Sequence, residues 1–477
     1  MTVTTPLSGW RGRTILATLA LAGVVAALVQ TLVLPLLPLF PAWLGISVAD
    51  AQWIATSTML AGAIGAPLFG WLGDRFGLAR MIVLSLVLLS LGSVVAALAD
   101  TLWVMLVGRV LQGLSAGIVG LALALARTTL SPGALPWAVG VVSGTLGIGT
   151  GLGVPLAGVL LETLPWQSVF WIAAALGAVS ALSVAVLVPH RPSGSTKRFD
   201  VVGAIVFSGI LLAVLVPLSM LGTGGVGVGS VVSWSVAALA AIWWVRHELR
   251  TPSPFVDVRF ARRQPILSSH LSALLIGAAF FLSFTGTVYV AQTPTVDGVG
   301  LGGSVLLTGI VQTPASLASI AAAPLATFVA TRWGARRTVT AGAFAVTVAS
   351  LARLPILDDP VVVAVCALLV SGSASFTFAA MPLVLMDASP VHATGTVNGL
   401  NIMMRQIGSA GAGVIGAIVL AATADATAPS RDTFSWLFGL GALCGLLAGL
   451  AMLPWRRRAQ HLVSLASPSP DPERTPR

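Results

Sequence analysis

The chain has 477 residues, of which 56% are hydrophobic and only 8% are charged. Soluble domains average roughly 25% charged residues, so this composition excludes a soluble globular protein of this size. The net charge of +10 does not indicate nucleic-acid binding, because the basic residues lie in short loops between apolar stretches, as the positive-inside rule expects. Cys366 and Cys444 lie inside apolar runs and are not expected to form a disulfide or a metal site.

Fourteen apolar stretches are long enough to cross a bilayer, which takes about 20 mostly apolar residues per helix. They cover residues 14–37, 52–72, 79–98, 102–124, 136–161, 168–188, 200–221, 229–247, 266–291, 302–328, 336–354, 360–381, 398–421 and 433–454. The first stretch follows Arg11 and Arg13, as a signal peptide would. It is too long for the apolar region of a signal peptide, however, and no small-residue cleavage site follows it. We expect it to be retained as the first helix of an all-α integral membrane protein.

The basic residues lie on one side of this helix map. With the N-terminus inside, the inner segments hold most of the 25 lysines and arginines, and the outer segments hold only Arg353 and Arg431. A wrong helix count would invert this asymmetry partway along the chain, and it never inverts. We therefore expect an even number of helices in the inner or plasma membrane, with both termini in the cytoplasm. The Pro- and Ser-rich tail, residues 456–477, is expected to be disordered.

A loop motif recurs eight helices apart. The loop after the second stretch, residues 70–80, reads GWLGDRFGLAR, and the loop after the tenth, residues 331–337, reads TRWGARR. Their alignment pairs Arg75 with Arg332, Phe76 with Trp333, Gly77 with Gly334 and Arg80 with Arg337. The recurrence predicts two six-helix halves separated by two extra helices, the parallel-repeat plan of a transporter. The predicted units are residues 1–190, 191–263 and 264–455, followed by the tail.

The first copy of this loop has the residues of a cytoplasmic gate. The predicted gate residues are Gly70, Asp74, Arg75, Gly77 and Arg80. Glycine allows a tight turn between helices, and an Asp near a helix end can form a charge-relay latch with the neighbouring arginines. The alternative is an ordinary charged loop. The second copy has Thr331 in place of Asp74, so only the first copy can form the full latch.

Four further stretches carry motifs. They are Gly108-Arg109-Val-Leu-Gln112-Gly113, Gly149-Thr-Gly151-Leu-Gly153-Val-Pro155-Leu-Ala-Gly158, Pro254-Phe255-Val-Asp257, and Asn398-Gly-Leu-Asn401-Ile-Met-Met-Arg405-Gln406-Ile-Gly408. With the loop at 70–80, they make the chain resemble the major facilitator superfamily, specifically its fourteen-helix drug:proton antiporter (multidrug efflux) branch. The resemblance runs from Gln30 to about Leu420. It implies two six-helix bundles with two inserted central helices, and it identifies the stretch with Gly151, Gly153, Pro155 and Gly158 as the antiporter-like helix, with Val154 where the family usually has glycine.

No Asp or Glu lies inside any predicted helix. Ionisable groups inside a bilayer are costly and are therefore functional candidates. The embedded charges are Arg109 and Arg405, with His270 near the inner end of its helix. The family's first helix usually carries an Asp followed by Thr, where this chain has Gln30 and Thr31. Glutamine cannot exchange a proton at physiological pH.

Gln30 and Arg109 are both expected roughly 10 Å from the outer surface, at a depth where they can hydrogen-bond to each other. In one interpretation, Arg109 attracts an anionic or amphipathic substrate. In the other, Arg109 and Arg405 bond only helix-end carbonyls and Gln112 or Gln406. If protons drive transport, the carrier is another group. The candidates are Asp50, Glu162, Asp387 and His270.

The predicted cavity is lined by small, apolar and amide side chains. The candidates are Gln52, Trp53, Thr56, Gln312, Phe376, Phe378, Met381, Asn398 and Asn401. An apolar, aromatic cavity suits hydrophobic or amphipathic ligands. Gly144, Gly147, Gly151 and Gly158 are expected to let helices approach closely, as packing or hinge positions.

These observations predict a secondary active transporter that exports hydrophobic or amphipathic small molecules by proton antiport. The alternative is an exporter or uniporter of an anionic or lipid-like compound without carboxylate-based proton coupling. A membrane enzyme or receptor is disfavoured, because the predicted helices hold no Ser/Lys, paired-Asp or His-Glu-x-x-His set. We expect no catalytic residue, cofactor or metal. The expected partners are a small-molecule substrate, protons and membrane lipids, with no nucleic acid, and the expected state is a monomer.

Overall fold

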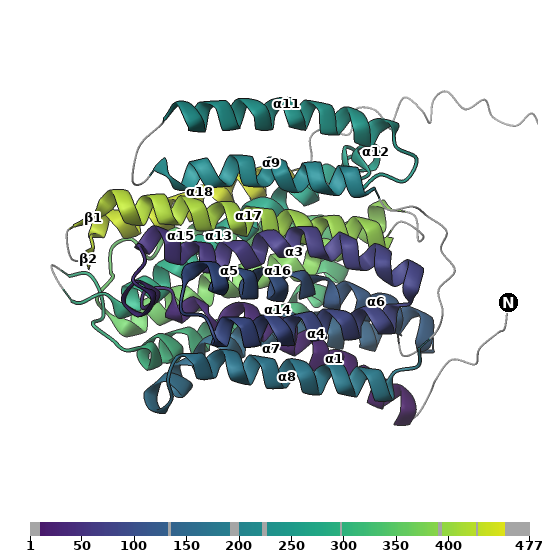
Figure 1. Cartoon of the computed structure of the whole chain (residues 1–477), viewed down its shortest axis with the longest axis horizontal. Coiled ribbons are helices and arrows are strands. Elements are labelled where there is room, and N and C mark those ends of the chain that lie inside the picture. Colours follow the sequence, from purple (N-terminus) through teal and green to yellow (C-terminus); the bar gives the residue numbers. More distant parts are fainter. Residues whose placement is uncertain are drawn as a thin grey trace, which may run out of the picture.

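The protein is almost entirely helical (Figure 1). A computed structural model of the chain describes residues 10–131, 135–190, 200–221, 227–295, 298–389, 394–425 and 428–453. Its elements are α1 (Trp10–Leu32), the 3-10 turn η1 (Leu34–Leu36), α2 (Phe40–Leu44), α3 (Val48–Phe76), α4 (Leu78–Ala97), α5 (Leu102–Gly113), the 3-10 turn η2 (Leu114–Gly117), α6 (Ile118–Thr129), α7 (Leu135–Thr163), α8 (Gln167–Leu187), α9 (Val201–Ser219), α11 (Val228–Arg250), α12 (Val258–Ala261), α13 (Ile266–Gln292), α14 (Val305–Trp333), α15 (Ala335–Leu351), α16 (Pro360–Ala388), α17 (Thr394–Thr423) and α18 (Arg431–Met452), with a two-stranded antiparallel pair of β1 (Ala424–Asp425) and β2 (Ala428–Pro429).

Twelve helical segments of the described chain are long and apolar enough to cross a membrane. One of them, Leu102–Thr129, combines α5, η2 and α6. Two further predicted stretches correspond to α7, with 29 residues, and α15, with 17 residues. The chain is therefore a multi-pass membrane protein, whereas its fourteen crossings stay a prediction. The predicted disordered tail lies outside the described residues.

Local sequence signals explain several helix ends. Ser47 and Asp50 form a capping box at the start of α3, in which each side chain accepts the other residue's backbone N–H. Gly77 between α3 and α4 and Gly334 between α14 and α15 have φ of 105° and 89°. Glycine adopts such positive φ values without the strain of a Cβ, so both turns can be tight. The two copies of the loop motif therefore share a backbone conformation, as their alignment predicts.

Two helix pairs join the first and second halves of the bundle. α7 packs along α14, and α3 packs along α17. Within the first half α1 packs on α7 and α4 on α8, and within the second half α13 packs on α17 and α18, and α14 on α16. The helices run roughly parallel or antiparallel to one another (Figure 1).

The two central helices, α9 and α11, form a hairpin on the outside of this bundle. α9 contacts α17 and α3, and α11 packs on α9, so α11 is the outermost helix in Figure 1. The outward side chains of α11 are apolar, and the rest of the protein does not cover them: Val228 is 83% exposed and Leu239 is 68% exposed. Such a surface suits a lipid environment, where apolar side chains carry no hydration cost.

Candidate functional site

The interfaces of α7 are built on glycines that alternate between two neighbouring helices. A Cβ on Gly151 would lie 2.9 Å from Cβ of Ser316, and one on Gly158 would lie 2.9 Å from the carbonyl oxygen of Val305, both on α14. Gly153 instead faces Thr31 of α1. Glycine at these positions lets the backbones approach closely, as predicted. The prediction was wrong for Gly144, around which no described atom lies within 4 Å of a built Cβ.

Pro155 lies in the same interface. A Cβ on Gly309 of α14 would lie 3.0 Å from Cα of Pro155. Proline inside a helix removes one backbone hydrogen bond and leaves room for a bend. The motif from Gly149 to Gly158 therefore fits α7 between α1 and α14, at one of the two seams between the halves.

A small hollow lies where α7, α13, α14 and α16 meet. Its lining comprises Gly151, Phe280, Phe284, Gln312, Ala315, Ser316, Ser319 and Ser371. Phe280 and Phe284 lie with their ring centroids 5.8 Å apart. Gln312 is 2% exposed, and neither its Nε2 nor its Oε1 has a hydrogen-bond partner among the described residues. A buried amide without partners costs about 1–3 kcal/mol, so Gln312 is available to bind a ligand that enters the hollow.

Polar contacts join the two halves where α13 meets α3 and the turn η1. Nε2 of Gln52 donates to the hydroxyl of Tyr289 at 2.9 Å, and both side chains are buried. Nε2 of Gln292 donates to the carbonyl of Pro35 at 2.8 Å. Gln52 was a predicted cavity residue. Tyr289 and Gln292 were not, although Tyr289 is the only tyrosine of the chain and stands out inside an apolar stretch.

Arg109 is held by groups of the first half. Its Nε donates to the carbonyl of Ile54 at 2.9 Å, and its Nη1 donates to Oε1 of Gln112 at 2.6 Å. Gln112 in turn donates to Ser93 at 2.7 Å. Of the described hydrogen bonds, none joins Arg109 to Gln30, which is half-buried. The predicted contact between those two residues is therefore wrong, and the arrangement is the alternative in which Arg109 bonds a helix carbonyl and Gln112.

Two predicted cavity residues near the first half lie against neighbouring helices. The hydroxyl of Thr31 donates to the carbonyl of Leu28 at 3.2 Å and lies 3.5 Å from that of Gly149. Trp53 packs with Leu215 and Ala410, between α9 and α17. Neither side chain lines the hollow.

Asn398, Asn401 and His270 lie at the junction of α13 with α17. Nδ2 of Asn401 donates to the carbonyl of Ser269 at 3.2 Å and lies 3.5 Å from Nδ1 of His270. His270 is 4% exposed, and its Nε2 has no partner among the described residues. Asn398 is half-buried. The structure thus brings Asn401 and His270 together, which their separation in sequence did not reveal.

Arg405 of α17 lies over the ring of Phe378, with 5.0 Å between Cζ and the ring centroid. Its guanidinium has neither a hydrogen bond nor an ion pair with any described residue, and the side chain is half-buried. A cation–π contact of this kind supplies only part of the solvation that an arginine loses in a membrane. Arg405, and not Arg109, is therefore the embedded cation that lacks acceptor groups.

The predicted gate loop is exposed at the junction of α3 and α4. Asp74, Arg75 and Arg80 are exposed, and Arg75 lies over the rings of Trp71 and Phe76, at 5.4 and 5.5 Å from their centroids. Gly77 supplies the turn, and Gly70 has open space around it. The loop is placed as a helix-end motif, while its action as a latch stays a prediction.

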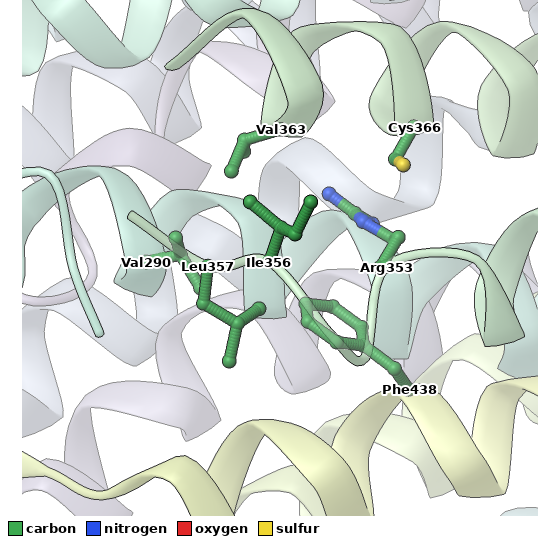
Figure 2. A pocket seen from close by; sticks show the side chains of 7 residues that line it. All are labelled: Val290, Arg353, Ile356, Leu357, Val363, Cys366 and Phe438. Carbon is green, nitrogen blue, oxygen red and sulfur yellow. The ribbon is translucent and has the colours of Figure 1, made fainter. Parts of the chain in front are cut away.

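Arg353 is a buried arginine that the sequence placed in an outer loop. It is 2% exposed, its Nη1 donates to the carbonyl of Ser283 at 3.2 Å, and its Nη2 donates to Thr287. Its guanidinium lies 4.4 Å from the ring centroid of Phe438. Figure 2 shows it beside Val363 and Cys366, among the side chains that line a small pocket. The residue follows the end of α15 and links it to α13 and α18. It lies near the end of the predicted stretch 336–354, and the sequence does not show which helices it contacts.

Several helices extend beyond the predicted stretches and include acids near their ends, which are Asp50 and Asp74 in α3, Glu162 in α7, Glu248 in α11, Asp387 in α16 and Asp432 in α18. The eighth predicted stretch ended at residue 247, whereas α11 continues to Arg250. Glu248 is 2% exposed. The charged residues that follow Trp244 interrupt the apolar pattern, so hydropathy does not predict the last turn of this helix.

The family model of the Major Facilitator Superfamily matches residues 19–413 of the chain. The tetracenomycin C resistance and export protein of Streptomyces glaucescens is 29% identical over 437 residues, which cover 88% of this chain and 79% of that protein. The putative multidrug resistance protein MdtD of Salmonella heidelberg is 29% identical over 343 residues, 70% of each chain.

Solved transporters have the same fold. The POT family transporter PepTSo superposes with a TM-score of 0.66 and 14% identity, covering 93% of this chain and 98% of its own. The xylose transporter XylE of E. coli, in a partially occluded inward-open conformation, superposes with a TM-score of 0.63 and 12% identity, covering 94% of this chain and 98% of its own.

Proposed function

This chain belongs to the Major Facilitator Superfamily, and we propose that it exports hydrophobic or amphipathic small molecules as a secondary active transporter. The observation that carries the proposal is the small hollow between the halves, which is lined by Phe280, Phe284 and Gln312, whose amide has no partner among the described residues. Apolar walls with a few polar groups are typical of sites for small amphipathic ligands. Relatives named for tetracenomycin C export and for multidrug resistance support the direction of transport and the ligand class.

The proposed topology has fourteen crossings, with both termini in the cytoplasm of a cell whose inner or plasma membrane holds the protein. α7 is long enough to cross, and α15 reaches roughly 26 Å at 1.5 Å per residue, close to the thickness of the hydrocarbon core. Residues 1–190 and 264–455 form the two six-helix bundles, residues 191–263 supply the inserted hairpin, and residues 456–477 form a cytoplasmic tail. The protein acts as a monomer in contact with lipid.

The contacts between the two halves suggest how the transporter opens to each side of the membrane in turn. In this orientation the contacts of Gln52 with Tyr289 and of Gln292 with Pro35 lie towards the outer side, where they hold the halves together. Opening to the outside requires these bonds to break while the glycine-lined α7–α14 interface lets one half rock against the other. In this structure the hollow has room for little more than a water molecule, whereas drug-sized sites take roughly 300–1,000 Å³, so such a ligand needs this movement to enter.

His270 is the proposed proton carrier for antiport. Asp50 serves in a helix cap, and Glu162 and Asp387 are exposed, so these three acids have local or solvent-facing roles. His270 is buried beside Asn401 and has one ring nitrogen without a partner. An imidazole can take up and release a proton, which the amide of Gln30 cannot do.

The test is uptake into inverted membrane vesicles across a panel of cationic, neutral and anionic hydrophobic compounds, with and without a proton gradient. Antiport predicts faster uptake under the gradient, measurable proton counterflow, and loss of that acceleration in His270→Gln with uptake by exchange retained. Uptake that the gradient leaves unchanged for every compound contradicts the antiport. ATP hydrolysis by the purified protein would contradict the proposal that it is a secondary transporter.

A second candidate, export of an anionic amphipathic compound without proton coupling, is favoured by Arg405. Its guanidinium lies over Phe378 without an acceptor among the described residues. An anionic group bound there would replace the missing partner. The same vesicle panel separates the two candidates: Arg405→Gln should lower uptake of the anionic compounds selectively, whereas equal losses for all three charge classes oppose this candidate.

A further inference from the structure

Three titratable side chains meet where the inserted hairpin joins the linker to the second half. Asp200 caps α9, and its Oδ1 accepts the N–H of Gly203 at 2.8 Å. Nε2 of His247, in the last turn of α11, lies 3.0 Å from Oδ2 of Asp200. Glu248 follows His247 in the chain. Asp200 is 9% exposed and Glu248 is 2% exposed, so the two carboxyl groups are buried, whereas the imidazole of His247 is 26% exposed.

Glu248 has one paired and one unpaired oxygen. Oε2 accepts the N–H of Val256 at 3.1 Å, whereas Oε1 is buried without a hydrogen-bond partner among the described residues. A Cβ on Gly203 would lie 2.5 Å from Oε1 of Glu248 and 2.5 Å from Oδ2 of Asp200. The two oxygens are therefore no more than about 5 Å apart, a separation at which two carboxylates repel strongly when both are ionised.

A bound proton can relieve the repulsion between these two carboxyl groups, whereas the residues are not arranged to hold a metal ion. The described residues include no group of three His, Cys, Asp or Glu side chains that could hold a metal. A proton on Oε1 removes one of the two negative charges and supplies a donor on the side of Asp200, while His247 remains the partner of Asp200. We propose that Asp200, His247 and Glu248 form a proton-binding site, with the proton on Glu248, that holds the linker between the hairpin and the second half in place.

The linker packs against the α3–α17 seam of the transporter. Phe255, next to Val256, packs with its ring centroid 5.7 Å from that of Phe207, and Phe207 lies 5.1 Å from Trp244. These residues share a buried cluster with Ala63 of α3 and Met403 of α17. When Glu248 is neutral, its Oε2 keeps the N–H of Val256. When the proton leaves, the cost of a buried carboxylate, together with repulsion from Asp200, drives the side chain towards solvent against the bond to Val256, which is then lost.

Few other charges face this site. Asp200 of α9 and His247 of α11 are the charged groups that interact with Glu248, and the linker contributes backbone N–H groups of Phe255 and Val256. α3 and α17 contribute only apolar side chains to the cluster. Arg259 of α12 donates to the carbonyl of Leu249, so it is occupied by the backbone end of α11. Protonation of Glu248 therefore changes the charge balance of the site.

The first test is infrared difference spectroscopy of the purified protein in lipid nanodiscs, between neutral and alkaline pH. A protonated carboxyl group gives a C=O band that disappears on ionisation. The expected result is a band loss in the wild type that is absent in Glu248→Gln, which keeps the volume and the hydrogen-bonding directions of the protonated acid. Asp100→Asn, which removes an exposed carboxylate, should leave the band loss unchanged. Persistence of the band loss in Glu248→Gln overturns the proposal.

The second test measures release of the linker. Val256→Cys, in a chain with Cys366 and Cys444 replaced by serine, is labelled with a water-soluble maleimide across the same pH range. In the same chain with Glu248→Gln, the labelling rate changes with pH only because the thiol ionises. The labelling rate with Glu248 divided by the rate with Glu248→Gln therefore measures opening of the linker. This ratio should rise by about tenfold per pH unit until Glu248 is ionised. Equal rates at every pH overturn the proposal. Neither test needs a transported compound, so failure of the export proposal does not affect them.

Discussion

The hydrogen bond between Gln52 and Tyr289 should set the balance between the two orientations of the transporter. Tyr289→Phe removes the acceptor of Gln52 Nε2, and Oε1 of Gln52 already has no partner among the described residues. In the state with the outer side closed, the buried amide of Gln52 then has no hydrogen-bond partner, which destabilises that state by about 1–3 kcal/mol. Opening the outer side hydrates the amide, so the outward-open fraction should rise by about 5- to 150-fold.

The assay is a distance measurement between spin labels at Leu98 and Ile356, exposed positions on the two halves near the predicted outer side. In Tyr289→Phe the long-distance population should grow. Adding Gln52→Leu to Tyr289→Phe removes the unsatisfied amide and should restore part of the short-distance population. Unchanged distances in Tyr289→Phe, with normal thermal stability, refute the reasoning, because the bond would then not hold the outer end closed.

Four further substitutions test other parts of the structure. Gly151→Ala should lower the free energy of unfolding by about 1–3 kcal/mol because its Cβ crowds α14, whereas the matched control Gly144→Ala should not; equal melting temperatures oppose this view of the seam. Gln312→Leu should raise the melting temperature of the ligand-free protein by removing a buried unsatisfied amide, and should slow transport; a lower melting temperature contradicts the assignment. Gln30→Asp should increase the pH dependence of transport, and an unchanged pH profile removes the argument at that position. Arg353→Met should cost about 1–3 kcal/mol of stability by leaving the acceptors in α13 without a donor, while a neutral result in thermal unfolding means that they find other partners.

Much of the architecture could be read from the chain because the bilayer imposes it. Apolar length and backbone hydrogen bonding make a membrane-crossing helix a local property, so nearly every predicted stretch coincides with a long helix. The recurring loop motif likewise predicted the matching turns at Gly77 and Gly334, because a positive φ requires glycine at both positions. The glycines of α7 predicted close packing for the same steric reason.

The partners of the embedded polar groups were decided only by the tertiary structure. Arg109 and Gln30 lie at similar predicted depths, yet the rotation of their helices turns Arg109 to Ile54 and Gln112 instead. Arg405 was a candidate for ordinary capping, and its position over Phe378 leaves it without an acceptor among the described residues. Depth follows from residue number, but the direction in which a side chain faces depends on how helices pack around it.

The chain by itself determined a multi-pass helical protein and predicted two related halves, because hydropathy and motif recurrence can be read along the sequence alone. Only the folded arrangement decided which amide stays unpaired in the hollow and which acids meet in the hairpin. Gln312 gains its role from four helices that leave it no partner, and Glu248 gains its neighbour Asp200 from 48 residues earlier because α9 and α11 fold back on each other. Such pairings depend on distances between helices, which no single stretch of sequence contains.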